Sequence, residues 1–234
     1  MPTDHVSPSL GRQGTAPDRR LPLTARGLGL DTAERRVLDE VDITLEPGSF
    51  TALTGASGAG KSTLLWLLAG ALRPTRGTVS YAGTTVTDHD AAIRAGVRLV
   101  PEGVALVTPL TARENLVVAL LLQGVPAVEA YERAEAALEQ VRLSDSGDHL
   151  VEELSGGQQQ RVAVARGLAL RASVLLADEP TSELDAANRD AIIALLAAEA
   201  AAGAVVLLAT HDSWCADQAD AEYHLDEGRL QRVR

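Results

Sequence analysis

The segment Gly55–Ser62 reads G-A-S-G-A-G-K-S and brings small residues together with one lysine and one hydroxyl. Glycines let backbone N–H groups approach an anion without a Cβ in the way, and a helix that begins beyond them presents its positive end. The Lys61 ammonium can reach the outer phosphates of a nucleotide, and the Ser62 hydroxyl can coordinate Mg²⁺. A strand before the segment and a helix after it favour this interpretation over a chance Gly-rich turn. The predicted nucleotide-binding residues are Gly55, Ala56, Ser57, Gly58, Ala59, Gly60, Lys61, Ser62 and Thr63.

Lys61 is the only lysine in a chain whose Lys and Arg residues together number 21. The planar fork of arginine is larger than a compact ammonium and differs from it in shape, so an arginine cannot do the same work at this position. We therefore count Lys61 among the predicted catalytic residues.

A second element is V-L-L-A-D-E-P, Val174–Pro180, in which an apolar strand ends in two adjacent carboxylates. Asp178, at the carboxyl end of the strand, can hold Mg²⁺ through a water, as the strand carboxylate does in phosphate-loop ATPases. Glu179 is a candidate general base for the attacking water. Acidic residues often end strands, so this motif alone is weak evidence. Its position after the Gly-rich segment strengthens the interpretation as a metal and catalytic site. ATP and Mg²⁺ are the expected cofactors.

A third element is L-S-G-G-Q-Q-Q-R, Leu154–Arg161, which has the features of another helix start. Ser155 can cap the helix, Gln158 sits three residues on, and Gly156 and Gly157 expose backbone donors. The result is a second anion site that the chain does not need for its own nucleotide. A solvated helix cap would be the default interpretation of an isolated S-G-G.

Alternating strands and helices position these elements, and such alternation predicts a mainly parallel sheet covered on both faces. Residues Val37–Leu45 alternate apolar and polar side chains, which predicts an edge-type antiparallel strand before the turn at Pro47-Gly48. A short helix and a hairpin are expected to close the chain. The other predicted strands are Phe50–Leu53, Thr78–Tyr81, Val97–Val100, Val174–Ala177 and Ala204–Ala209, and the predicted helices include Ser62–Leu72, one after Ser155 and Ala186–Ala202.

Residues 105–170 are expected to form a helical insertion between strands of the sheet. Within them Leu110–Arg142 is predicted to be helical, and Thr111 and Glu114 have capping-box spacing. The apolar stretch Leu116–Leu122 has two open interpretations, core packing or a surface that meets a membrane partner, because periodicity alone does not separate them.

Composition restricts the partners and the compartment. The net charge of −11 argues against a nucleic-acid partner held by a broad basic surface. Cys215 is the only cysteine, so no intrachain disulfide forms, and we expect it to be a small core or surface residue and no catalytic thiol. No run reaches the roughly 18 apolar residues of a membrane span, and the N-terminus lacks the apolar centre of a signal peptide. We predict a disordered tail at residues 1–20 and a cytoplasmic protein, peripheral on the inner face of the cell membrane.

The three elements in this order resemble the nucleotide-binding subunit of ATP-binding cassette (ABC) transporters, over about residues 23–229. The resemblance implies an α/β phosphate-loop NTPase fold: a mainly parallel sheet core, an antiparallel β subdomain and an inserted α-helical subdomain, forming one domain over residues 21–234. It also implies a head-to-tail dimer. ATP on the Gly55–Ser62 loop of one chain is then closed over by Ser155 and Gly157 of the other chain, with Gly156 and Gln158 in the same signature.

Further matches to the family follow. The segment S-E-L-D, Ser182–Asp185, is similar to the dimer-contact loop, with Asp185 in its usual place and Glu183 where alanine is usual. His211 is similar to the switch histidine that contacts the γ-phosphate. We expect the other histidines, His5, His89, His149 and His224, to be surface residues.

Two departures from the family pattern concern the metal and the base. Glu102 stands where the family has a glutamine that touches Mg²⁺ and the lytic water; a carboxylate is also a hard ligand, so metal contact can survive its extra charge. The family stacks the adenine on an aromatic residue, and residues 20–45 contain no Phe, Tyr, Trp or His, with Thr32 nearest to the matching position. We expect weak discrimination between ATP and GTP.

The resemblance implies an ATPase whose dimer closes on ATP and drives a separate membrane-spanning permease, as a translocase. The motifs resemble most the lipoprotein-releasing and macrolide-export branch. The expected partners are a second ABC subunit and the permease. A soluble or non-transport ABC ATPase, associated with cell division, DNA or ribosomes, is the alternative. A regulatory cassette that only binds ATP is opposed by Glu179 and His211.

Overall fold

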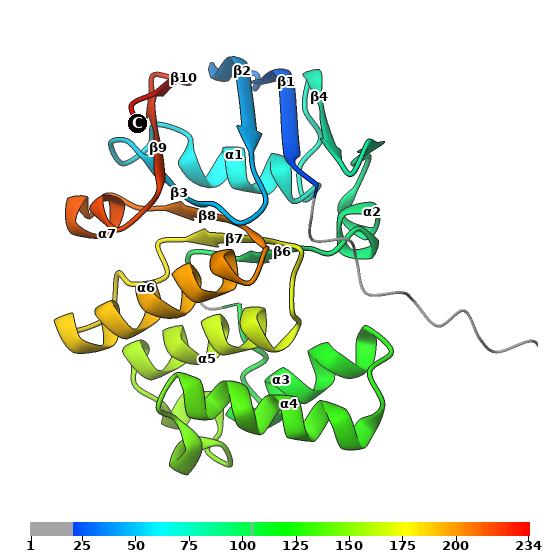
Figure 1. The fold of residues 1–234 in the computed structure, drawn as a ribbon, viewed down its shortest axis with the longest axis vertical. Helices are drawn as coiled ribbons and strands as arrows, with labels where there is room; N and C mark the ends of the chain where they lie inside the picture. The colour runs from blue at the N-terminus through cyan, green and yellow to red at the C-terminus, as the bar shows by residue number, and fades with distance from the viewer. Residues whose placement is uncertain (1–20, 104) are drawn as a thin grey trace, which may run out of the picture.

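The computed structural model describes residues 21–103 and 105–234, and the tail predicted at residues 1–20 lies outside the described residues. Two sheets organise the chain (Figure 1). The larger has the strand order β10-β9-β3-β8-β7-β6, and all its neighbours pair in parallel except the final hairpin β9–β10. Its strands are β3 (Phe50–Thr54), β6 (Val97–Val100), β7 (Val174–Asp178), β8 (Val205–Ala209), β9 (Ala221–Asp226) and β10 (Arg229–Arg232).

The neighbouring strands β7 and β8 are buried at every position. Their sequences, V-L-L-A-D and V-V-L-L-A, lack polar alternation because both faces of a parallel sheet are covered by helices. The predicted parallel core is therefore confirmed. The one carboxylate in these two strands is Asp178, the last residue of β7.

The smaller sheet is antiparallel, with the order β2-β1-β4-β5. Its strands are β1 (Leu23–Asp31), β2 (Arg36–Leu45), β4 (Arg76–Tyr81) and β5 (Thr84–Thr85). The predicted edge strand at 37–45 is confirmed as β2. The sequence analysis missed β1, in which irregular pairing around Gly27 interrupts the alternation of apolar residues.

Helix α1 (Lys61–Leu68) lies between the two sheets, where its leucines pack against side chains from both (Figure 1). It begins one residue before the predicted start and ends well before Leu72, because Gly70 adopts a positive φ and turns the chain. The remaining helices are α2 (His89–Arg94), which was not predicted, α3 (Ala112–Leu122), α4 (Ala127–Gln140), α5 (Gly156–Ala169), α6 (Ala186–Ala201) and α7 (Ser213–Asp217), with 3-10 turns at Ser144–Ser146 and Val151–Glu153.

Helices α3, α4 and α5 follow one another between the neighbouring strands β6 and β7 and extend away from the sheet (Figure 1). The prediction of one helical run over Leu110–Arg142 was wrong at its middle. Gly124 ends α3 with a positive φ, and Pro126 precedes α4 with the fixed φ that suits a helix start. The predicted capping box is confirmed, since Glu114 N donates to Thr111 Oγ1 at 3.1 Å and Thr111 N donates to Glu114 Oε2 at 2.9 Å.

The stretch Leu116–Leu122 packs partly in the core and is partly exposed, so core packing is confirmed for its buried residues and contact with a membrane partner stays a prediction. Leu116, Val117 and Leu120 are buried in the core, whereas Leu121 and Leu122 are exposed. Among the described residues, no helix combines the length and apolar character that a membrane crossing requires.

Asn115 holds the segment between β6 and α3 in place, and its removal should cost stability. Its side chain accepts from Val107 N at 2.8 Å and donates to Val107 O at 3.1 Å and Thr111 O at 2.9 Å. We expect Asn115→Ala to lower the free energy of unfolding by about 2 kcal/mol, because the variant loses three hydrogen bonds and leaves the backbone groups that formed them without this partner. Urea denaturation measures this change. The exposed Gln140→Ala is the control, and equal stability of both variants would contradict the prediction.

Candidate nucleotide-binding site

The loop between β3 and α1 has a backbone that only glycine accepts easily. Gly55, Gly58 and Gly60 all have positive φ values. A Cβ at Gly55 would stand 2.3 Å from the carbonyl oxygen of Leu225, so no larger residue fits there without moving β9. The loop ends at the N-terminus of α1, which faces the pocket described below.

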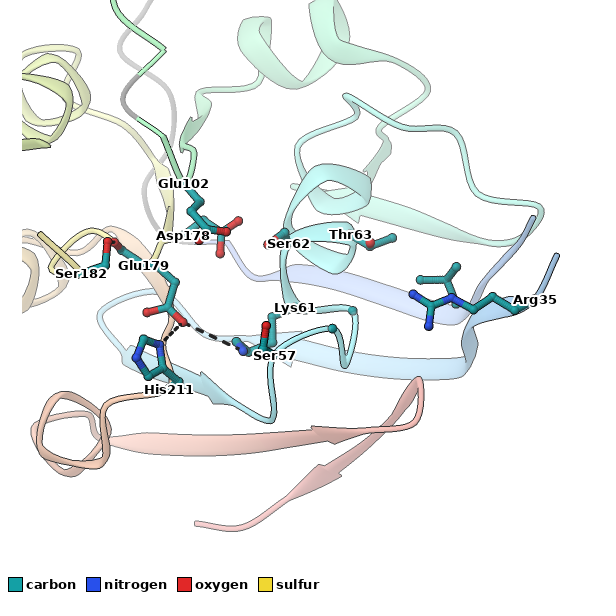
Figure 2. Close-up of a pocket in the computed structure, with 13 residues that line it drawn as sticks. Arg35, Ser57, Lys61, Ser62, Thr63, Glu102, Asp178, Glu179, Ser182 and His211 are labelled. Atoms are coloured by element: carbon teal, nitrogen blue, oxygen red, sulfur yellow. Dashed lines mark hydrogen bonds and ion pairs between the residues drawn. The ribbon is translucent and has the colours of Figure 1, made fainter. Parts of the chain in front are cut away.

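Lys61 is almost fully buried, and its ammonium lies close to two backbone carbonyls and one carboxylate. Its ammonium donates to Gly55 O at 2.8 Å and to Ala56 O at 3.3 Å, and it lies 4.0 Å from Glu179 Oε1. The ammonium thus spans the mouth of the glycine loop and points toward the end of β7 (Figure 2).

Glu179 follows β7 in a strained conformation. Its φ is +45°, in a region that non-glycine residues rarely occupy, and its N–H donates to Ala209 O at 2.9 Å. His211 Nδ1 lies 2.8 Å from Glu179 Oε1, so the carboxylate stands between an imidazole and the Lys61 ammonium (Figure 2). This arrangement holds one carboxylate oxygen in place and leaves Glu179 able to orient and deprotonate a water.

Asp178 is buried to 1% exposure, and neither of its carboxylate oxygens has a hydrogen-bond partner among the described residues. Burial raises the pKa of Asp178, and the charges of Glu102 and Glu179 raise it further, while Ser62 and Lys61 act in the opposite direction. Unpartnered buried carboxylate oxygens are costly unless a cation or a donor satisfies them when the site is in use.

These residues fit a Mg²⁺ ion. The orphaned oxygens of Asp178, the Ser62 hydroxyl and the Glu102 carboxylate face one pocket (Figure 2) and are the hard oxygen donors that Mg²⁺ prefers. No cluster of three or more His, Cys, Asp or Glu side chains in the described part of the chain could hold a metal by itself. Phosphate oxygens and waters would supply the remaining ligands, as is usual for this ion.

One pocket of about 400 Å³ gathers most of the predicted site. Figure 2 shows Glu179 and His211 at one end of it and Arg35 at the other. The predicted residues that line it are Ser57, Gly58, Gly60, Lys61, Ser62, Thr63, Glu102, Asp178, Glu179 and His211. Ala56 and Ala59 line an adjoining pocket with Arg35, and Gly55 lines a third pocket together with His211.

The L-S-G-G-Q segment lies elsewhere in the same chain. Ser155, Gly157 and Gln158 line a separate pocket with Glu183 and Asp185, and it shares no residue with the first pocket. The helix start has the predicted form. Ser155 N donates to Gln158 Oε1 at 2.9 Å and Gln158 N donates to Ser155 Oγ at 3.3 Å.

Residues Glu183, Leu184 and Asp185 also line this second pocket. Asp185 caps α6 by accepting from Asn188 N at 2.9 Å, and this hydrogen bond is the main reason that its pKa is lowered. A Cβ at Gly157 would stand 2.9 Å from Glu183 O, whereas one at Gly156 would meet only the Glu183 carboxylate at 3.7 Å. Gly157 is therefore required by packing, and Gly156 is not.

The sequence analysis missed three residues of the site. Gln160 is buried, and its amide donates to Glu179 O at 3.3 Å, so the signature helix supports the strained residue from behind. Its sequence neighbours Gln159 and Arg161 are polar, so no local pattern marked Gln160 as buried. Arg35 and Val37 line the far end of the pocket, and nothing local in the sequence marked them.

The remaining predictions concern single residues. Cys215 is buried as a packing residue, and burial raises the pKa of its thiol to about 11, so it does not serve as a thiolate. His89, His149 and His224 are exposed as predicted, and His5 lies outside the described residues.

Comparison with known proteins gives a consistent result. A family model described as ABC transporter matches residues 38–182. The chain is 39% identical over 209 residues to the pyoverdine export ATP-binding/permease protein PvdT of Pseudomonas fluorescens (strain Pf0-1), covering 87% of this chain and 32% of that protein. It is 35% identical over 236 residues to the macrolide export ATP-binding/permease protein MacB of Azoarcus sp. (strain BH72), covering 98% of this chain and 36% of that protein. The chain thus spans about a third of the length of these curated relatives.

Solved structures agree with this result. The dimeric post-hydrolysis structure of the ATP-binding cassette MJ0796, bound to ADP and Pi, superposes with a TM-score of 0.83 at 28% identity. It covers 91% of this chain and 99% of that one. A further structure, described as the dimeric MJ0796 bacterial ABC transporter cassette, has the same TM-score.

The buried carboxylate of Asp178 makes a pH prediction. Because the folded protein binds this proton more tightly than the unfolded chain, the group lowers stability as pH rises from its ordinary pKa of 3.8 through its raised folded pKa. Without nucleotide and Mg²⁺, Asp178→Asn should therefore raise Tm at pH 7 by a few degrees and by less at pH 4.

Adding ATP and Mg²⁺ should reverse the order, stabilising the wild-type chain more than the variant. Differential scanning fluorimetry across pH measures both effects. An Asp178→Asn variant that is less stable than wild type at pH 7 without ligand would contradict the prediction that the buried Asp178 carboxylate destabilises the folded chain.

Proposed function

This chain belongs to the ABC transporter family, and we propose that it hydrolyses ATP to power a membrane-spanning permease. The observation that carries the proposal is the convergence of Lys61, Glu179 and His211 on one pocket, with the Glu179 carboxylate 2.8 Å from the imidazole and 4.0 Å from the ammonium. A binding-only role would not require a held carboxylate beside the phosphate loop.

In the proposed reaction the glycine loop and the N-terminus of α1 bind the phosphates of ATP through backbone N–H groups. Lys61 shifts its hydrogen bonds from Gly55 O and Ala56 O to the outer phosphates. Ser62 and Asp178, with Glu102 beside them, would hold Mg²⁺, which neutralises charge on the phosphates when bound.

Glu179 then takes a proton from the attacking water at its carboxylate, while His211 orients that carboxylate and donates a hydrogen bond toward the γ-phosphate. The water attacks phosphorus in line with the leaving oxygen of ADP. The products are ADP and inorganic phosphate.

The separation of the two pockets within one chain supports a composite site. Ser155, Gly156, Gly157 and Gln158 present anion-binding groups at the start of α5 that no residue of the same chain's phosphate loop approaches. We propose that they cover the ATP of a second copy, with Asp185 in the contact between the copies. ATP binding then closes the dimer, and hydrolysis opens it.

The proposed permease meets the exposed apolar side chains of the helical insertion. Val107, Leu121, Leu122, Val128 and Tyr131 are large hydrophobic residues that remain exposed around α3 and the start of α4. Exposed apolar groups that gather on one element favour a protein partner. The names of the relatives, which describe export ATP-binding/permease proteins, support export as the activity. The proposed site of action is the cytoplasmic face of the membrane.

The base end of the pocket supports broad purine recognition. Arg35 and Val37 line this end, and no aromatic residue of the described chain does so. A guanidinium can stack on either adenine or guanine, and an aliphatic side chain packs on both equally, so neither reads the edge of the base.

A variant of Glu179 tests the proposed function directly. We expect Glu179→Gln to lower the rate of phosphate release at least about a hundredfold, because the amide cannot accept the proton, while ATP binding persists. Phosphate release and bound nucleotide per chain are the measurements. Glu132→Gln, an exposed change on α4, is the control. Turnover of Glu179→Gln near the wild-type rate would remove Glu179 as the base.

Base recognition gives a separate prediction. The KM values for ATP and GTP should agree within about threefold, because nothing at the base end reads the base edge. Arg35→Ala should raise both KM values about fivefold with kcat unchanged, and Arg35→Tyr should restore them through an aromatic face. Arg26→Ala, an exposed change on β1, is the control. A preference for ATP above about tenfold would contradict weak base selection.

A further inference from the structure

A corner between α6 and α7 holds a charged and aromatic cluster that the proposed reaction does not use. Arg189 Nη1 donates to Asp212 Oδ2 at 3.3 Å, and the guanidinium carbon lies 4.1 Å from the centre of the Trp214 ring. On its other edge Nε and Nη2 both donate to Asp190 Oδ1 at 3.2 Å. One guanidinium therefore joins a carboxylate of α6, the loop after β8 and the first turn of α7.

The loop in question carries His211. Its neighbour Asp212 donates its N–H to Thr210 Oγ1 at 3.0 Å and caps α7 by accepting from Trp214 N at 2.8 Å. Thr210 is fully buried, so the loop is anchored at its start by the sheet. Beyond His211 the loop is held through the Asp212 carboxylate, which pairs with the Arg189 guanidinium.

His211 itself has little packing to hold it. Its side chain is 68% exposed, and its hydrogen-bond partner is Glu179. The direction of the imidazole must therefore come from the backbone of the loop. The Arg189–Asp212 pair suits this task because its side chains are only 25% and 33% exposed, and the Trp214 ring covers the face of the guanidinium.

Arginine is the side chain that this corner requires. Its planar group uses one face for an aromatic ring and its edges for two carboxylates, whereas a lysine ammonium would satisfy one of these contacts at a time. The position on α6 also matters. Arg189 N donates to Asp185 O at 2.8 Å in the first turn of the helix, directly after the segment Ser182–Asp185.

We propose that Arg189 is a positioning residue for ATP hydrolysis, which fixes the loop Thr210–Asp212 and thereby holds the His211 imidazole against Glu179. The inference rests on the proposed role of His211 at the γ-phosphate. It also means that the helix which starts at the dimer-contact segment carries the residue that aligns the catalytic pair.

The test compares variants of the corner in the full chain. Arg189→Ala should lower kcat about tenfold with KM for ATP unchanged, since a misdirected imidazole weakens the transition state and not the binding of ATP. Arg189→Lys and Trp214→Ala each keep part of the cluster and should lower kcat about threefold, whereas Trp214→Phe should stay near wild type. Steady-state phosphate release gives both constants, and Tm reports folding.

Asp190→Asn is the matched control because it removes the other carboxylate of the same guanidinium and leaves the link to Asp212. We expect its kcat to be unchanged. His211→Ala separates the two proposals: if it leaves kcat unchanged, the proposed role of His211 fails. If it lowers kcat at least tenfold while Arg189→Ala stays within about twofold of wild type, the positioning role of Arg189 is wrong. A rise in KM with unchanged kcat in Arg189→Ala overturns it as well. Should Arg189→Ala not fold, Arg189→Lys and Trp214→Ala decide by the same criteria.

Discussion

Two adjacent carboxylates at the end of a buried strand impose the constraint on which the rest of the site depends. Asp178 is the last residue of β7 and Glu179 follows it, and the other residues of β7 are all apolar and buried. Charges in such a place need partners, and the chain supplies them unequally. Glu179 is partnered by Lys61 and His211, while both oxygens of Asp178 find no hydrogen-bond partner in the described part of the chain. The structure thus holds the Glu179 carboxylate in place and leaves the Asp178 carboxylate available to a cation.

The scaffold explains how these groups meet. Neighbouring parallel strands end at the same edge of the sheet, so the phosphate loop after β3, the carboxylates after β7 and His211 after β8 converge. The signature helix has two functions in this arrangement. Gln160 supports Glu179 from within the same chain, while Ser155 and the glycines begin the helix in a pocket of their own. The helical insertion therefore contacts the proposed catalytic base of its own chain, and in the proposed dimer its N-terminal end meets the nucleotide of another chain.

The sequence predicted the site residues that lie within short continuous motifs. Gly55–Ser62, Asp178, Glu179 and the capping box at Ser155 lie within short segments, and the structure has them in the predicted elements. It missed β1, where irregular pairing hides the alternation, and the break at Gly124, because the apolar pattern continues on both sides of the turn. Gln160 and Arg189 escaped notice for another reason. Their partners Glu179 and Asp212 lie 19 and 23 residues away in sequence, and only the folded chain brings each pair together.

We propose that one nucleotide site needs two copies of the chain, and light scattering of chains in which hydrolysis is blocked measures whether ATP brings the copies together. Gly156 suits the experiment because a side chain there meets no backbone, whereas one at Gly157 would collide with Glu183. In the Glu179→Gln background the account predicts dimers when ATP is added. Adding Gly156→Asp should leave ATP binding per chain intact and keep the chains monomeric, since the new carboxylate occupies the anion site offered to the partner. Dimers that form equally well with Gly156→Asp would contradict the account.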